Sequence, residues 1–388
     1  MRHRRRALLT SVLLAFGCAN KSSTIQLPAI TATITPDWES PFARTSGWTG
    51  ADGAATIPLP NNKTLWLFGD TWIGPVIDGR HAEGSTMVNN TIAISPAGPT
   101  PPAHDDIQFL WGTATGKPAA WAVPTQPGEW FWPASGGLIV PSPRGDRLLL
   151  FMARISRIDN SNSVWNFQGR GSTLLSIANP TDDPAAWRIE QFPLNTLGPG
   201  RRVITWGVAA LHDPREAKGD LFVYGVDSAS NVNKLLVQAK APAGTAQDFA
   251  TWRFRAASQW SDQEADATAV VENVSSEVSI HAFKVGGRDT WVMVYSEPPL
   301  GAGILVRTSS SALGPWSEPT RVYTCPEPET DPKLMVYSAK AHPELSIPGE
   351  LLISYCLNST DFWDVAAHAD KYRPRFVRIP ERALARRK

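Results

Sequence analysis

One kind of apolar segment recurs five times along this chain of 388 residues. Each copy follows a short turn and ends in a small or polar residue, which is typical of a buried β-strand. The first large apolar residues of successive copies are 83, 73, 70 and 60 residues apart. The copies are LWLFGD (65–70), RLLLFMAR (147–154), DLFVYGVD (220–227), TWVMVYSE (290–297) and ELLISYCLN (350–358).

Further strands accompany each copy. A Gly- or Ser-flanked strand precedes it, a third strand follows most copies, and a fourth element carries Trp187, Trp252 or Trp316 in three of them. Five recurrences of a four-stranded unit predict an all-β, five-bladed β-propeller with four-stranded antiparallel blades. A β-sandwich with coincidental strand spacing is the alternative. We expect only a short helix, within residues 361–372.

The N-terminal residues resemble an export signal. Four arginines among the first six residues precede an apolar segment that is too short to span a bilayer, and Gly17 and Cys18 then resemble the end of a bacterial lipobox. We therefore expect a protein of the bacterial cell envelope, with membrane contact only through lipid on Cys18. Cleavage without lipid, giving a secreted protein, is the alternative. The expected divisions are a signal peptide (1–18), a tether (19–40), the propeller (41–380) and a basic tail (381–388).

Charge and cysteine content limit the partners and the redox state. The formal net charge is +1, so nothing favours a nucleic-acid partner. We expect a monomer. Cys18 would carry lipid, which leaves Cys325 and Cys356 as an even pair in an oxidising compartment. A disulfide between them is predicted, with two buried free thiols as the alternative.

Two carboxylates flank the first apolar copy. Asp70 ends this strand, and Asp52 lies 18 residues earlier, just before the strand that precedes it. A hairpin of the two strands would bring both carboxylates to one cavity. The alternative is that Asp70 only caps a turn, because Gly-Asp is common turn chemistry.

The first strand of each unit would line the central channel of a propeller. These strands supply one carboxylate, Glu277, and five candidate substrate-binding residues: Trp132, Trp206, Tyr337, Lys340 and His342. Alternatives remain for most of them. The two tryptophans could belong partly to the core, His342 could be a structural histidine, and Lys340 could simply pair with Glu277 or Glu344.

Paired carboxylates in an aromatic cavity suit glycoside hydrolysis, in which one acts as an acid while the other activates water or attacks the sugar. The motifs of serine hydrolases, zinc proteases and nucleotide-binding proteins are absent from the sequence. We expect a polysaccharide or oligosaccharide substrate, Asp52 as base, Asp70 as acid, Glu277 in support, and inversion. The assignment of acid and base could be reversed. We expect no cofactor, although a carboxylate pair could hold Ca²⁺. A sugar-binding propeller without activity is the alternative function.

Three segments resemble a known family: GADGAATIPLPNNKTLWLFGDTWIG (50–74), YSAKAHPELSIPGELLISYCLNS (337–359) and YRPRFVRI (372–379). They are similar to domain-of-unknown-function family 4185, which includes D-arabinan-degrading enzymes of glycoside hydrolase family 183. The resemblance implies a five-bladed propeller and catalytic acidic residues in the first blade, at Asp52 and Asp70. It also makes an arabinan-type furanose polymer a candidate substrate. Cys356 departs from the family pattern, in which Asn is more usual.

Overall fold

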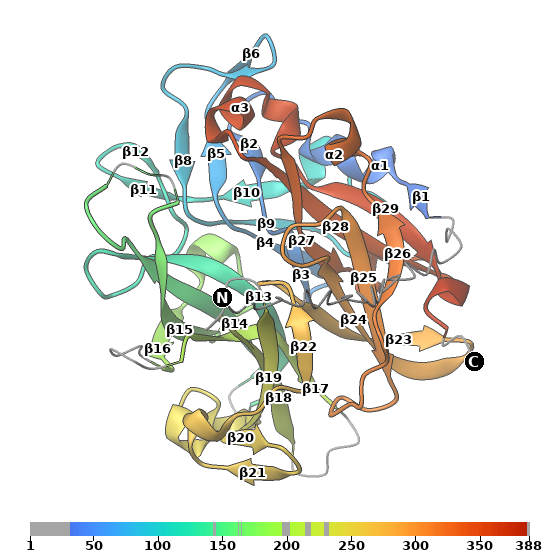
Figure 1. Ribbon diagram of the computed structural model, residues 1–388. Helices are drawn as coiled ribbons and strands as arrows, with labels where there is room; N and C mark the ends of the chain where they lie inside the picture. Colours follow the sequence, from blue (N-terminus) through green and yellow to red (C-terminus); the bar gives the residue numbers. More distant parts are fainter. Residues whose placement is uncertain are drawn as a thin grey trace, which may run out of the picture.

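The structure is a computed structural model that describes residues 32–142, 145–161, 163, 165–195, 202–213, 219–228 and 233–385. Strands dominate these residues, which confirms the all-β class. The α-helices of the described residues are short: α1 (Pro36–Glu39), α2 (Glu327–Thr330) and α3 (Phe362–Ala367). Helix α3 lies inside the segment where a short helix was expected. The larger sheets are arranged around a common centre (Figure 1).

Five antiparallel sheets of four or more strands follow one another along the described residues. In hydrogen-bonded order, the first contains β3 (Ala55–Leu59), β4 (Lys63–Phe68), β9 (Thr91–Pro96) and β10 (Gln108–Leu110). The second contains β13 (Glu129–Val140), β14 (Arg147–Ser156), β15 (Gln168–Ile177) and β16 (Ile189–Pro193). The third contains β17 (Ile204–His212), β18 (Asp220–Asp227), β19 (Lys234–Pro242), β20 (Arg253–Ala256) and β21 (Gln259–Ser261), with β22 (Val271–Val274) also on β19.

The last two large sheets complete the series. The fourth contains β23 (Ser279–Val285), β24 (Arg288–Ser296), β25 (Gly303–Ser309) and β26 (Thr320–Thr324). The fifth contains β27 (Leu334–Ala341), β28 (Glu350–Ser359), β29 (Arg375–Pro380) and β1 (Thr33–Ile34). The smaller sheets are insertions, formed by β2 (Trp48–Ala51), β5 (Thr71–Ile73) and β8 (Thr86–Val88), by β6 (Val76–Ile77) and β7 (Arg80–His81), and by β11 (Gly112–Ala114) and β12 (Lys117–Ala119).

The five apolar copies of the sequence are the second strands β4, β14, β18, β24 and β28, and their ends lie within two residues of the predicted ones. Strand β14 shows why these runs are continuously apolar. Leu148 and Leu150 pack in a cluster with Leu65 of the first sheet. The intervening residue Leu149 packs in a different cluster with Val223 of the third sheet. Because both faces of β14 are covered, both sets of alternating side chains must be apolar.

The first strands of the large sheets meet at the centre of the molecule. Contacts join β3 to β13, β13 to β17, β17 to β23 and β23 to β27. Two hydrogen bonds connect the fifth sheet with the first. Thr56 Oγ1 lies 2.7 Å from His342 Nδ1, and Ser338 Oγ donates to the Gly53 carbonyl over 3.3 Å. The first strands therefore line the centre, as the sequence predicted.

Three of these first strands are interrupted at corresponding places. The pairing register shifts between Pro133 and Gly137 in β13, between Trp206 and Ala209 in β17, and between Tyr337 and Lys340 in β27. Each interruption contains a residue with positive φ, namely Ser135 at 83°, Gly207 at 89° and Ser338 at 55°. Such bulges redirect side chains and are frequent beside functional sites.

The ends of the chain differ from the expected divisions. Residues 33–42 form β1, α1 and a short 3₁₀ turn, and the buried Trp38 and Phe42 lie in this segment, so the folded part begins before residue 41. Leu384 is also buried, so the expected tail begins too early. Residues 1–31, with Cys18 and the expected signal and lipobox, lie outside the described residues. No helix within the described part is long and apolar enough to cross a membrane.

The predicted disulfide between Cys325 and Cys356 is wrong. Both cysteines are free and buried in the structure. Cys325 packs in the apolar cluster between the fourth and fifth sheets, and Cys356 lies opposite Tyr337 in the pairing of β27 with β28. The alternative of two buried thiols therefore describes these residues.

Candidate active site

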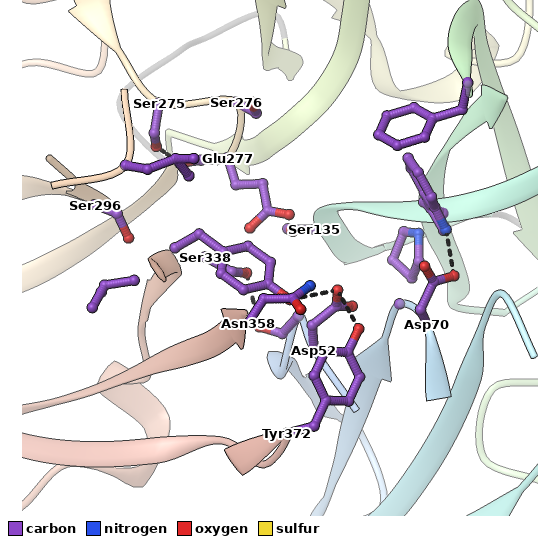
Figure 2. A pocket seen from close by; sticks show the side chains of 18 of the residues that line it. Asp52, Asp70, Ser135, Ser275, Ser276, Glu277, Ser296, Ser338, Asn358 and Tyr372 are labelled. Atoms are coloured by element: carbon purple, nitrogen blue, oxygen red, sulfur yellow. Dashed lines mark hydrogen bonds between the residues drawn. The ribbon is translucent and has the colours of Figure 1, made fainter. Parts of the chain in front are cut away.

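A cavity of about 360 Å³ opens at the centre, where the first and fifth sheets meet. Its walls include all three predicted carboxylates, Asp52, Asp70 and Glu277, and two of the predicted binding residues, Trp132 and Tyr337. Figure 2 shows Asp52 beside Tyr372, with Asp70 and Glu277 to either side. The structure therefore brings five of the predicted site residues to one cavity.

The two aspartates are placed by one hairpin. Strands β3 and β4 pair antiparallel, with Ala55 opposite Leu67, as predicted. Beyond the strand ends, the Gly69 amide donates to the Asp52 carbonyl over 3.0 Å, and the Asp52 amide donates to the Asp70 carbonyl over 3.3 Å. A methyl group on Gly69 would lie 2.2 Å from Asp52 Oδ1. Gly69 is therefore required because the carboxylate occupies the space of a side chain.

The Asp52 carboxyl group is held by two phenols. Tyr337 and Tyr372 each donate to Oδ2, over 2.8 and 3.0 Å. Burial in the cavity wall, together with the negative charges of Asp70 and Glu277, raises the pKa of Asp52 to about 8. The phenol hydrogen bonds oppose this rise without cancelling it. Asp52 is therefore mostly protonated at neutral pH.

The Asp70 carboxyl group has a different set of partners. Trp132 Nε1 donates to Oδ1 over 2.8 Å, and Asn89 Nδ2 donates to the same atom over 3.3 Å. Burial raises the pKa of Asp70 to about 6, and these two hydrogen bonds limit the rise. Asp70 is therefore mostly ionised at neutral pH. The prediction that Asp70 does no more than cap a turn is not supported by this environment.

Glu277 is the third carboxylate of the cavity, and it is paired with a buried cation. Lys340 Nζ lies 3.2 Å from Glu277 Oε2, and the Lys340 side chain is only 1% exposed. Lys340 is absent from the cavity lining, so the expectation that it binds substrate is not supported, and the alternative of pairing with Glu277 describes it. Its role here is to hold Glu277.

Besides Lys340, the structure places two more of the expected binding residues, Trp206 and His342, away from the cavity. Trp206 is fully buried in the core of the second and third sheets, where its Nε1 donates to Glu264 Oε1 over 2.6 Å. His342 is fully buried between Thr56 and Ser354, and burial lowers its pKa to about 3. Neither side chain can touch a ligand in the cavity, so both are structural residues.

Several residues of the site were missed by the sequence analysis. They are Tyr372 and Asn89, which hold the two aspartates, and the cavity-lining Phe167, Asn358 and Phe362. Tyr372 opens the YRPRFVRI segment, but nothing in that segment marks it as a partner of Asp52. Phe362 begins helix α3, and the others lie in loops or near strand ends without a distinguishing pattern.

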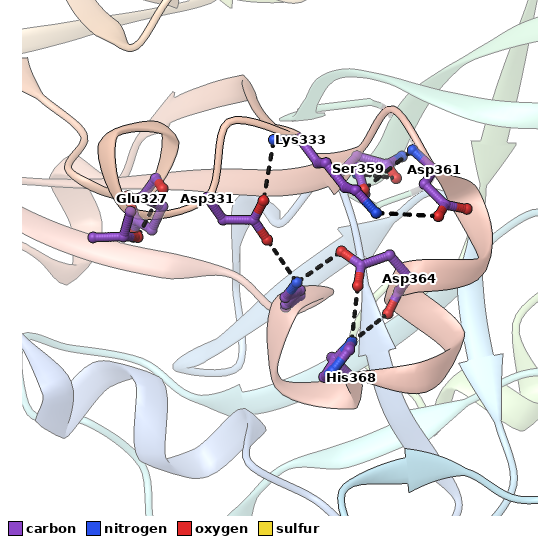
Figure 3. Close-up of polar contacts among 10 residues, drawn as sticks. Glu327, Asp331, Lys333, Ser359, Asp361, Asp364 and His368 are labelled. Atoms are coloured by element: carbon purple, nitrogen blue, oxygen red, sulfur yellow. Dashed lines mark hydrogen bonds and ion pairs between the residues drawn. The ribbon is translucent and has the colours of Figure 1, made fainter.

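Helix α3 and the following turn, which carry Tyr372, are fixed by a network of charges (Figure 3). Lys371 Nζ bridges Asp331 Oδ2 and Asp364 Oδ2 over 2.8 and 2.7 Å. The Tyr372 carbonyl oxygen also packs closely against Gly50, where an added Cβ would lie only 2.3 Å from it. These contacts set the position of the phenol beside Asp52.

The family described as "Domain of unknown function (DUF5005)" matches residues 36–381. The chain belongs to this family. The resemblance to domain-of-unknown-function family 4185 is therefore wrong, and the expectation of an arabinan-type substrate, which rested on it, is withdrawn. No curated protein matches the chain.

Three solved structures are similar to this chain to different degrees. A "putative hydrolase" from Bacteroides ovatus ATCC 8483 has a TM-score of 0.68 at 20% identity, with 92% of this chain and 97% of that chain covered. A protein of unknown function from Dyadobacter fermentans DSM 18053 has a TM-score of 0.44 at 11% identity, covering 91% of this chain and 100% of that chain. A thermostable family-43 glycoside hydrolase has a TM-score of 0.41 at 14% identity, covering 86% of this chain and 89% of that chain.

Proposed function

We propose that this protein is a glycoside hydrolase that cleaves a polysaccharide or oligosaccharide with Asp52 and Asp70 as its acid–base pair. The observation that carries the proposal is the pair itself. Two carboxyl groups line one cavity, and their different surroundings hold the pKa of Asp52 near 8 and that of Asp70 near 6. Between these values one group is protonated while the other is ionised, which is the division of labour that glycoside hydrolysis needs.

The roles follow from these protonation states. Asp52 donates its proton to the glycosidic oxygen as the bond to the leaving sugar breaks. Asp70 accepts a proton from the water that attacks the anomeric carbon. This assignment reverses the one made from the sequence. The charge on Glu277 contributes to the raised pKa of Asp52, and Lys340 keeps that carboxylate in place.

The aromatic side chains in the cavity walls are suited to sugar binding. Trp132, Phe167 and Tyr337 line the cavity around the carboxyl groups. Their flat apolar faces can cover the C–H faces of a sugar ring, while the tryptophan and tyrosine keep a polar atom for hydrogen bonding. Both polar atoms are already directed at the carboxyl groups, so the rings and the acid–base pair form one unit.

We also infer that the five large sheets are the blades of a five-bladed propeller. The argument rests on the order of the strands within each sheet and on the ring of contacts among the first strands. Strand β1 pairs with β29, so an N-terminal strand completes the last sheet. This arrangement would close the ring and place the cavity on its axis.

Export with lipid on Cys18 remains a proposal that rests on the sequence alone. Intact-mass analysis of the mature protein tests it, because a mature chain that begins at Cys18 with acyl chains would support lipidation. Inversion at the anomeric carbon also remains a prediction. Proton NMR of the first-formed product distinguishes inversion from retention.

The function is tested by incubating the protein with a panel of polysaccharides that includes xylan and β-1,3-galactan and measuring released reducing sugar. Asp52→Asn and Asp70→Asn should each lower turnover of a cleaved substrate by about 10²-fold or more, because each removes a proton-transfer group. Asp78→Asn is the matched control, since Asp78 is exposed and lies outside the cavity lining. If either site variant keeps most of the activity, its residue is not catalytic.

Melting curves separate a catalytic loss from unfolding. Because the pKa of Asp52 is higher in the folded protein than in the unfolded chain, folding favours the protonated carboxyl group. This contribution to stability is fully present below the pKa of the unfolded chain and is lost as the pH rises through about 8. An uncharged replacement avoids this loss, so Asp52→Asn should melt no lower than wild type at pH 8. A much lower melting temperature for both variants would show that the pair is structural.

A further inference from the structure

Two further cavities adjoin the central cavity. A second cavity of about 390 Å³, here called the apolar arm, shares with it the residues Trp165, Leu300, Tyr337 and Asn358. A third cavity of about 440 Å³, here called the polar arm, shares with it the residues Asp70, Trp132, Phe167 and Phe362. The three cavities therefore form one cleft rather than a closed pocket.

The apolar arm offers flat surfaces to a ligand. Trp165 is 49% exposed and Leu300 is 53% exposed, so both present apolar surface to the cavity. Met335 adds a further apolar wall, while Asn358 and Thr360 supply hydrogen-bonding groups. Exposed aromatic surface with a few amide and hydroxyl groups is suited to a sugar ring.

The polar arm has a different chemistry. Arg157 lines it as an exposed side chain and makes no ion pair within the described part of the chain. Asn89 and Trp130 also line it. The loop that carries the wall is held by Asn166, whose Nδ2 donates to the Asp159 carbonyl over 2.8 Å. This arm therefore presents a fixed set of donors beside Asp70.

The catalytic groups lie at the junctions of the arms. Tyr337, which donates to Asp52, borders the apolar arm. Trp132, which donates to Asp70, borders the polar arm, as does Asp70 itself. Both arms share residues with the central cavity that Asp52 and Asp70 line, so a sugar chain that occupies both arms would contact this cavity.

We propose that the cleft binds a glycan chain across both arms, so that the protein cleaves bonds within the chain rather than releasing single sugars from its end. An enzyme that releases single sugars needs a wall that closes its site beyond one sugar unit, whereas here one further cavity adjoins the site at Tyr337 and another adjoins it at Asp70. This inference rests on the proposed function for its catalytic part. Its binding part, that several sugar units are held at once, can be tested without catalysis.

The test uses Asp52→Asn, which should bind without turnover, and calorimetric titration with oligosaccharides of xylan and of β-1,3-galactan of increasing length. Affinity for one series should increase with length until both arms are filled. No binding of any series, or an affinity that does not change with length, would overturn the inference.

Second substitutions assign the two arms. In the Asp52→Asn protein, Trp165→Ala and Arg157→Ala should each weaken binding of long oligosaccharides by about three- to tenfold, and should change binding of the shortest one much less. Trp363→Ala is the matched control, because Trp363 is 69% exposed and lies outside all three cavities. If neither arm variant differs from this control, the arms are not binding sites.

Product analysis with the wild-type protein separates the two proposals. Early release of oligosaccharides of mixed length supports cleavage within the chain. Hydrolysis that releases only single sugars would leave the proposed function standing and overturn this inference. Length-dependent binding with no hydrolysis would refute the proposed function alone and leave the two-armed cleft standing.

Discussion

At the residue scale, the chemistry depends on how closely the two aspartates are packed. Gly69 has no side chain, and the Asp52 carboxylate lies in the space that a side chain would fill. The Gly-Asp pair of the sequence was first interpreted as turn chemistry or as the end of a strand. The structure adds a physical reason for the glycine, which is the close approach of a carboxylate from the neighbouring strand.

We therefore predict that Gly69→Ala displaces Asp52 and lowers kcat by about 10-fold or more, because small misplacements of catalytic groups are costly. The measurement is the rate on a substrate cleaved by wild type, together with a melting curve. Gly244→Ala is the control, since no atom lies within 4 Å of a Cβ placed at Gly244. Equal rates for the two variants would show that the position of Asp52 does not matter.

At the element scale, the site depends on segments that the repeat pattern does not contain. The second strands were predicted to within two residues, since burial on both faces leaves a long apolar run in the sequence. The bulges in β13 and β27 were not predicted, because Ser135 and Ser338 carry no signal of positive φ. The position of Tyr372 was also not predictable, since it is set by contacts with residues far away in the sequence.

The charge network at α3 gives a test of this dependence. Lys371→Ala should loosen the turn before Tyr372 and lower activity several-fold, while costing about 1–2 kcal/mol of stability, because a partly buried pair loses its cation. Lys333→Ala is the matched control, because its ion pair with Asp361 is about half exposed on both sides and should contribute little. Kinetic assays and urea unfolding of both variants measure the losses of activity and stability. A larger loss for Lys333→Ala than for Lys371→Ala would contradict this prediction.

At the scale of the whole molecule, the first and last sheets are joined by the N-terminal segment that the sequence analysis assigned to a tether. The Trp38 ring lies 6.5 Å from that of Trp66 in β4 and 5.9 Å from that of Phe376 in β29. Phe42 packs in the same apolar cluster as these three rings. This segment is short and contains few apolar residues, so its sequence has no pattern that predicts a place in the core. Trp38 and Phe42 are buried only because the first and last sheets meet around them.

Trp38→Ala should therefore lower the free energy of unfolding by about 3–5 kcal/mol, as expected for removal of a fully buried indole. Urea unfolding measures this directly. Trp363→Ala, at an exposed tryptophan, should change it by less than about 0.5 kcal/mol. Similar values for the two variants would show that the N-terminal segment does not stabilise the junction.

The measurement that tests the central claim most directly is the pH dependence of kcat/KM on a substrate that the protein cleaves. Asp70 must be ionised and Asp52 protonated, so the rate should rise through about pH 6, fall through about pH 8 and be highest between them. Glu277→Gln should move the falling limb to lower pH, because the lost charge contributes to the raised pKa of Asp52. A rate that is constant between pH 5 and 9, or limbs that no carboxyl substitution moves, would contradict the account.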